Sequence, residues 1–180
     1  MTKRKQRTQY GVDNVRKKIK GIEQLILKGS VLAIDPSIIS SSSFPGYAWY
    51  VGGELDSAGI IEGISHRESV EKRLQFIGKY VRENFEEPDV LIYERVAARG
   101  GGFSLESTVK ATGAIIGNFE CEYVIPIAPL AWGTYVNQKL DIGKGNDYEN
   151  YQVYKEKYKS DEMDAIMIGY SLIQIAKENR

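Results

Sequence analysis

The chain has 180 residues, and its 24 Lys and Arg balance its 24 Asp and Glu, so the formal net charge at pH 7 is zero. A hydrophobic content of 42% and a charged content of 27% are typical of one globular domain, and no apolar run is long enough to span a membrane. The single Cys121 excludes an internal disulfide, and His66 is the only histidine, so zinc sites built on His and Cys clusters are excluded.

The charges are unevenly distributed along the chain. Residues 1–28 contain nine Lys and Arg against two Asp and Glu, which is a local charge of +7, and the remaining residues carry −7. A basic arm on an acidic body is common among nucleic-acid binders, although a solvated tail has the same composition. We expect residues 1–29 to form a basic arm with an amphipathic helix, and residues 30–180 to form one domain.

The arm has two parts. Residues 1–10 are polar and basic, and they are expected to be disordered without a partner. From Val12 the apolar residues recur at alternating spacings of three and four, which predicts one amphipathic helix that ends near Lys28. The run is shorter than three heptads, so packing on its own domain is favoured over a seam between two copies.

The next segment predicts an antiparallel meander of three strands. Residues 31–35 form a short apolar run between a Gly-Ser pair and a loop rich in Ser, Pro and Gly. Residues 47–51 and 55–61 read as two further strands, and the Gly52-Gly53 pair between them is a turn signal.

Helices and strands then alternate. A helical period over residues 67–85 precedes the apolar strand 90–93, an order that favours a parallel pair with a right-handed crossover. A helix over 104–117, a strand over 123–127 and a helix over 161–177 complete the predicted elements. Residues 129–160 give no clear prediction.

Acidic residues stand at the ends of three of these elements. Asp35 closes the first strand, Glu94 closes the strand 90–93, and Asp161 and Asp164 lie three residues apart on one face of the last helix. A carboxylate at the end of a buried strand needs a compensating partner, and hard cations such as Mg²⁺ take oxygen ligands. A divalent metal ion is a common partner of this kind, so the acidic residues at these element ends are candidates for a shared site.

The order of the predicted elements, three antiparallel strands and then alternating helices and parallel strands, resembles the plan of the RNase H-like superfamily. This is an α/β fold with a five-stranded mixed sheet flanked by helices. In that fold the first and fourth strands are neighbours, which would bring Asp35 and Glu94 together. Within the superfamily, residues 31–177 resemble the RuvC-type Holliday-junction resolvases, particularly the small phage-like members. The resemblance rests on residues 33–37, 91–96, 111–114, 143–145 and 161–165.

This resemblance implies a magnesium-dependent crossover junction endodeoxyribonuclease in which Asp35, Glu94, Asp161 and Asp164 are the catalytic, metal-binding carboxylates. Two Mg²⁺ ions are implied, with Mn²⁺ as the alternative. The protein would be a cytoplasmic homodimer, bacterial or phage-encoded, that nicks two opposing strands of a four-way DNA junction without membrane association. DNA contacts are expected from Lys3, Arg4, Lys5, Arg7, Arg95, Arg99, Phe103, Lys139 and Lys144.

The chain departs from the family pattern at several positions. The basic arm is an addition, because family members usually begin at the first strand. Many members carry an aromatic wedge where this chain has Ala97; Phe103 could serve instead, or it could pack as a staple at the start of a helix. His66 matches no catalytic position and is expected in a loop.

Aromatic residues outside the predicted metal site have two interpretations each. Tyr47, Trp49 and Tyr50 could stack on bases, but strand alternation places part of this set in the core. For Trp132 and Tyr135, core packing is favoured over contact with DNA or a second copy.

Three other functions fit parts of the pattern. An RNA–DNA hybrid nuclease or a flap nuclease would use the same carboxylates on a different substrate. A catalytically silent nucleic-acid-binding module would not need all four carboxylates. A nucleotide-binding, actin-like relative would need Gly-rich phosphate loops, and Gly52-Gly53 is too short to provide one.

Overall fold

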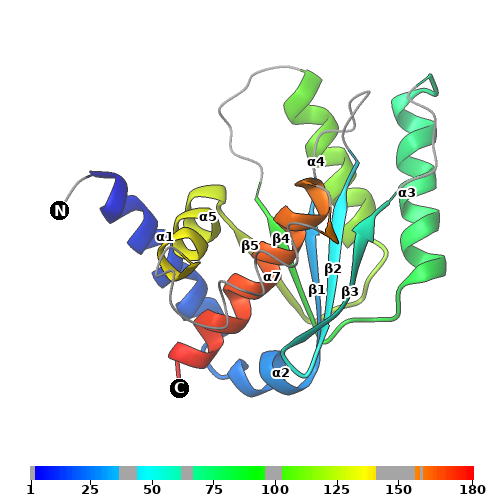
Figure 1. Cartoon of the computed structure of the whole chain (residues 1–180). Coiled ribbons are helices and arrows are strands. Elements are labelled where there is room, and N and C mark those ends of the chain that lie inside the picture. Colours follow the sequence, from blue (N-terminus) through cyan, green and yellow to red (C-terminus); the bar gives the residue numbers. More distant parts are fainter. Residues whose placement is uncertain (1–2, 37–43, 62–66, 96–102, 141–156, 159) are drawn as a thin grey trace.

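The structure, a computed structural model, describes residues 3–36, 44–61, 67–95, 103–140, 157–158 and 160–180. A five-stranded sheet of order β3-β2-β1-β4-β5 forms its centre (Figure 1). The strands β1, β2 and β3 form the expected antiparallel meander, and β4 and β5 run parallel to β1. Their bounds are Ser30–Asp35, Gly46–Val51, Glu54–Ile60, Val90–Glu94 and Tyr123–Ile127 for β1 to β5. The predicted five-stranded mixed sheet is therefore confirmed.

The sequence of each strand matches its place in the sheet. Residues 31–35 of β1 are all buried, as expected for a central strand covered on both faces. The β2–β3 turn places Gly52 at φ 62° and Gly53 at φ 80°. Two consecutive positive φ angles define the tight hairpin turn that favours paired glycines, so the turn signal in the sequence is confirmed.

Helices cover both faces of the sheet (Figure 1). One face packs against α1 (Lys3–Ile19), α2 (Glu23–Lys28), α5 (Pro129–Leu140) and α7 (Ser160–Glu178). The other face packs against α3 (Val70–Asn84) and α4 (Phe103–Ile116). Alternation along β1 and β4 divides their side chains between two cores: Ala33 and Ile92 lie on the α7 side, whereas Ile34 and Leu91 lie on the α3 and α4 side.

The N-terminal region differs from the prediction in two ways. The expected disorder of residues 1–10 is wrong from Lys3 onward, because α1 already begins there. The single helix expected from Val12 to Lys28 is also wrong: it is divided into α1 and α2, and Gly21 between them has φ 94°, a left-handed conformation that interrupts a right-handed helix. The apolar residues Val12 and Val15 are buried against this chain's own core, so α1 packs on its own domain.

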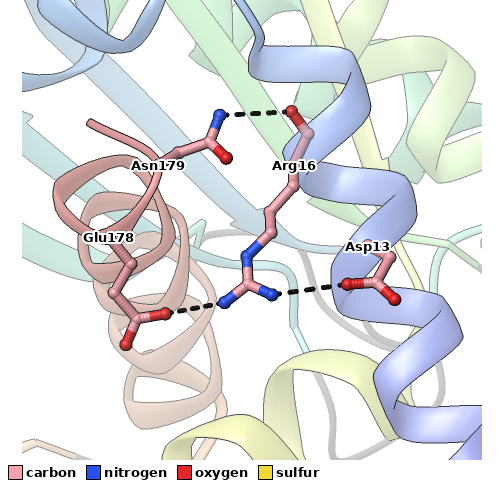
Figure 2. Close-up of polar contacts among 4 residues, drawn as sticks. All are labelled: Asp13, Arg16, Glu178 and Asn179. Carbon is pink, nitrogen blue, oxygen red and sulfur yellow. Dashed lines mark hydrogen bonds and ion pairs between the residues drawn. The ribbon is translucent and has the colours of Figure 1, made fainter.

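Polar contacts join α1 to the end of α7 (Figure 2). Arg16 Nη2 forms an ion pair with Glu178 Oε2 at 2.9 Å, while Arg16 Nη1 bonds Asp13 Oδ1 at 3.3 Å. Asn179 Nδ2 donates to the carbonyl oxygen of Arg16 at 3.5 Å and to Glu23 Oε1 at 2.7 Å. These contacts fix the C-terminal half of α1 to α7 and α2.

The helix α5 lies in the stretch that gave no clear prediction. Its sequence contains Gly133 and the β-branched Thr134 and Val136, which have low helix propensity, and the helix is stabilised by burying Ala131, Tyr135 and Val136. In the part of the chain that the structure describes, no helix has the length and apolar character needed to cross a membrane.

Candidate active site

Two of the predicted carboxylates lie at the ends of neighbouring strands. In the parallel pair of β1 and β4, Ile34 is opposite Tyr93, so Asp35 and Glu94 are the next residues along the two strands. By alternation both side chains belong to the face that α7 covers. Asp35 is only 8% exposed, and Glu94 is half-buried.

The first turn of α7 lies against the same strand ends. Gly46 is the cross-strand partner of Asp35, and a Cβ atom built on Gly46 would collide with the backbone carbonyl oxygen of Asp161. Glycine is therefore required for this close approach of helix and strand. Asp161 lies in this first turn, Asp164 follows three residues later and both are half-buried, so the fold brings all four predicted carboxyl groups to one edge of the sheet.

The pKa values of two of these groups reflect burial and mutual repulsion. Burial raises the pKa of Glu94 above its usual range, and the negative charge of Asp164 raises it further. Burial likewise raises the pKa of Asp164, with Asp161 adding a smaller effect in the same direction. These carboxylates are close enough to sense one another, and a positive charge between them would favour their ionised forms.

A fourth element contributes a residue that the sequence did not identify. Trp132, in the first turn of α5, donates a hydrogen bond from its indole Nε1 to Glu94 Oε2 at 2.6 Å. This bond lowers the pKa of Glu94, against the larger effect of burial. Core packing was favoured for Trp132, and it does pack against the core as a half-buried residue, but it also contacts a predicted catalytic carboxylate. The stretch that forms α5 gave no clear prediction of secondary structure. The sequence could therefore not place Trp132 beside Glu94.

The chemistry of the donor set suits a hard cation, because carboxylate oxygens are the ligands that Mg²⁺ prefers. Among the described residues, however, no three His, Cys, Asp or Glu side chains are arranged closely enough to hold one metal ion. The four carboxyl groups thus gather at one edge of the sheet without forming a closed ligand shell.

The predicted DNA-binding residues have different positions. Arg95 directly follows Glu94 and is exposed, and its backbone N–H donates to the carbonyl oxygen of Ile127 at 2.7 Å. Phe103 is the first residue of α4, and Lys139 lies in the last turn of α5. Arg99, Lys144 and the unassigned His66 lie outside the described residues. Four basic residues lie in the first two turns of α1: Lys3, Arg4, Lys5 and Arg7.

The aromatic residues of β2 divide between the two faces of the sheet. Tyr50 is 4% exposed, and its hydroxyl donates to the carbonyl oxygen of Ile166 in α7 at 2.7 Å. Tyr47 and Trp49 lie on the opposite face and pack on Phe85, with ring centroids 4.8 and 6.3 Å from it. Tyr47 and Trp49 also line a shallow hollow of about 240 Å³ there, which the four carboxylates do not line.

No protein-family model matches the sequence, and neither does any curated protein. Solved structures that are similar in three dimensions include two of RuvC. Thermus thermophilus RuvC in complex with a Holliday junction substrate has 19% sequence identity and a TM-score of 0.58, and the match covers 79% of this chain and 90% of that one. A second Thermus thermophilus RuvC structure has 20% identity and a TM-score of 0.56, with 79% and 92% of the two chains covered. Together with the strand order, these matches show that the chain has an RNase H-like fold.

Proposed function

We propose that this protein is a metal-dependent endonuclease that cleaves four-way DNA junctions by phosphodiester hydrolysis. The observation that carries this proposal is the gathering of Asp35, Glu94, Asp161 and Asp164 at one edge of an RNase H-like sheet. The junction as substrate is suggested by the structural similarity to a RuvC in complex with a Holliday junction.

In this proposal the four carboxylates hold Mg²⁺, or Mn²⁺ in its place, and two ions would be bound. Such ions supply a water that is activated for attack and a charge that stabilises the leaving oxygen. The chain's own contribution is the placement of the ligands. Asp35 and Glu94 are fixed by adjacent strands, and α7 presents Asp161 and Asp164 from one side.

DNA binding would use basic residues of α1 and of later parts of the chain. The four cations in the first two turns of α1, together with Arg95, Arg99, Lys139 and Lys144, would contact phosphates, which fix position without reading sequence. Phe103 would act as the aromatic wedge that opens the junction. A homodimer would nick two opposing strands of a four-way junction, because its two-fold symmetry presents two equivalent sites. We infer a cytoplasmic protein, bacterial or phage-encoded.

A cleavage assay with Mg²⁺ tests the proposal on four substrates: a four-way junction, a flap, an RNA–DNA hybrid and a plain duplex. We expect the junction to be cleaved fastest. Glu94→Gln should lower the cleavage rate by about 10²–10³-fold, since metal contributes several kcal/mol to such reactions. Junction binding should be retained, because it depends on phosphate contacts elsewhere.

Glu162→Gln is the matched control. It makes the same change of side chain, and Glu162 lies beside Asp161 in the first turn of α7 but is not among the four proposed ligands. This variant should cleave at close to the wild-type rate. Full activity of the Glu94→Gln enzyme would contradict the assigned site. Faster cleavage of the flap or the hybrid would redirect the proposal to those substrates, and binding without any cleavage would indicate a silent binding module.

A further inference from the structure

We propose that Trp132 is a positioning residue for Glu94, and that α1 supports it through α5. The inference rests on the proposed function, because it treats Glu94 as a metal ligand. Its basis is the 2.6 Å hydrogen bond from the Trp132 indole to Glu94 Oε2, which joins residues 38 positions apart in the sequence. The bond uses one acceptor site of Oε2 and fixes the orientation of the carboxylate, which keeps further lone pairs on its two oxygens for a cation.

The chemistry of the indole suits this role. An indole N–H is a donor only and does not titrate near neutral pH, so it can orient a carboxylate without neutralising it. A Lys or Arg at the same place would compete with a divalent cation for the charge of Glu94. Hydrogen bonds to an ionised acceptor are short and strong, and partners of this kind commonly orient the carboxylates that bind metals.

The position of the indole depends on how α5 is held. Ala131, next to Trp132, is 1% exposed and faces α1, where a Cβ atom built on Gly11 would lie 2.7 Å from Ala131 Cβ. The two helices can therefore approach this closely only because residue 11 is glycine. Farther along, α1 is fixed to α7 by Arg16 and Asn179 (Figure 2). A continuous set of contacts thus runs from α1 through α5 to the carboxylate of Glu94.

Mn²⁺ binding to the full-length protein, measured by titration calorimetry, tests the first step. Trp132→Phe keeps the aromatic ring and removes only the N–H donor. We expect its Mn²⁺ affinity to fall by about 10–100-fold, the usual cost of losing such a partner. Metal-free junction binding should be unchanged, and cleavage should recover at high metal concentration, because the ligands themselves remain.

Trp49→Phe is the matched control, because Trp49 is the other tryptophan of the chain and lies on the opposite face of the sheet. It should bind Mn²⁺ like the wild type. It also leaves Trp132 as the single tryptophan, so emission excited at wavelengths that tyrosine does not absorb should change as Mn²⁺ is added. The Trp132→Phe protein, which retains only Trp49, should show no such change.

Gly11→Ala tests the second step. In an ordinary helix this substitution is favourable, but here the added methyl group would push α1 and α5 apart. We expect weaker Mn²⁺ binding than in the wild type, and no further loss when Gly11→Ala is combined with Trp132→Phe, because both changes act through one bond. Gly133→Ala is the control on α5, since nothing lies within 4 Å of the Cβ it adds.

The possible outcomes separate the two proposals. Wild-type affinity in Trp132→Phe, with normal binding by the unaltered protein, would overturn the positioning role and leave the proposed function intact. Wild-type affinity in Gly11→Ala, or additive losses in the double variant, would overturn the support by α1. A wild-type protein that binds no Mn²⁺ and cleaves no junction would overturn the proposed function and this inference together.

Discussion

Burial and the proximity of other carboxylates control the pKa values of two carboxyl groups at the candidate site. The pKa values of Glu94 and Asp164 are both raised, chiefly because burial removes water from the charged form. A structural carboxylate usually has the opposite shift, since an ion pair or hydrogen bonds favour its charge. In the proposed function, a bound cation would provide the charge that compensates these two carboxylates.

Asp164→Asn should therefore stabilise the metal-free protein at neutral pH. The fold raises the pKa of Asp164 above its value in the unfolded chain, which is about 4. The ionised Asp164 therefore destabilises the folded protein. This effect is absent below the unfolded pKa and fully present above the folded pKa. We expect the variant to gain ~2–4 °C in Tm at pH 7, an upper bound because a half-buried group is partly screened by water. The gain should shrink toward pH 4.

Thermal unfolding in EDTA between pH 4 and pH 7 measures this effect. Adding Mg²⁺ should reverse the order of the two proteins, because metal binding stabilises only a folded protein with intact ligands. An Asp164→Asn protein that is less stable than wild type at pH 7 in EDTA would contradict the account of the site.

At the scale of elements, the site depends on how closely α7 approaches β2. Gly46 has no side chain, and the carbonyl oxygen of Asp161 occupies the space where one would be. The same strand residue pairs with Asp35, so one backbone position sets the distance between a strand carboxylate and the helix carboxylates.

Gly46→Ala should displace the first turn of α7. We expect a loss of ~1–3 kcal/mol in stability, as for other additions to a closely packed region. The cleavage rate should fall by about 10²-fold, since a displacement near 1 Å is enough to misplace catalytic groups. Single-turnover cleavage and thermal unfolding measure the two effects. Gly113→Ala, which adds a methyl group to open space in α4, should leave the cleavage rate unchanged and raise the stability by about 0.5–1 kcal/mol, the usual gain of Ala over Gly inside a helix.

The elements differ in how far the sequence predicts them. Strands such as β1 and β4 have uninterrupted apolar runs, and their carboxylates could be assigned because they follow those runs directly. The helix α5 has weak propensity and forms because Ala131, Tyr135 and Val136 are buried, which is a tertiary effect. The contact between Trp132 and Glu94 could not be predicted for the same reason.

For the whole molecule, the separation of charge is the main electrostatic feature. Four basic residues of α1, Lys3, Arg4, Lys5 and Arg7, precede the buried Val12, Val15 and Ile19, and in Figure 1 the N-terminal turns of α1 extend away from the sheet. The acidic groups lie on the body, with four of them at the candidate site. Attraction of DNA and cleavage of DNA would therefore be served by different regions.

Replacing Lys3, Arg4, Lys5 and Arg7 with glutamine should weaken DNA binding in a salt-dependent way. If all four contact phosphates, the slope of log affinity against log salt should flatten by about 3–4 units, because each contact releases nearly one counterion. Cleavage at saturating DNA should stay close to normal. Deletion of residues 1–10 should have the same effect and preserve the fold, since it leaves the buried Val12, Val15 and Ile19 of α1 in place. An unchanged slope would indicate that these four residues do not contact DNA phosphates and that the arm is a solvated tail.

The contacts of Arg16 and Asn179 also constrain the order of folding. Arg16 and Glu178 are 162 positions apart, so α1 is synthesised well before the helix that anchors it. Until α5 and α7 emerge from the ribosome, the apolar residues Val12, Val15 and Ile19 have no partner from either helix. Contacts between such distant residues slow folding and prolong the exposure of apolar surface. We therefore expect α1 to dock only after α5 and α7 have been synthesised, and its apolar residues to be accessible to chaperones until then.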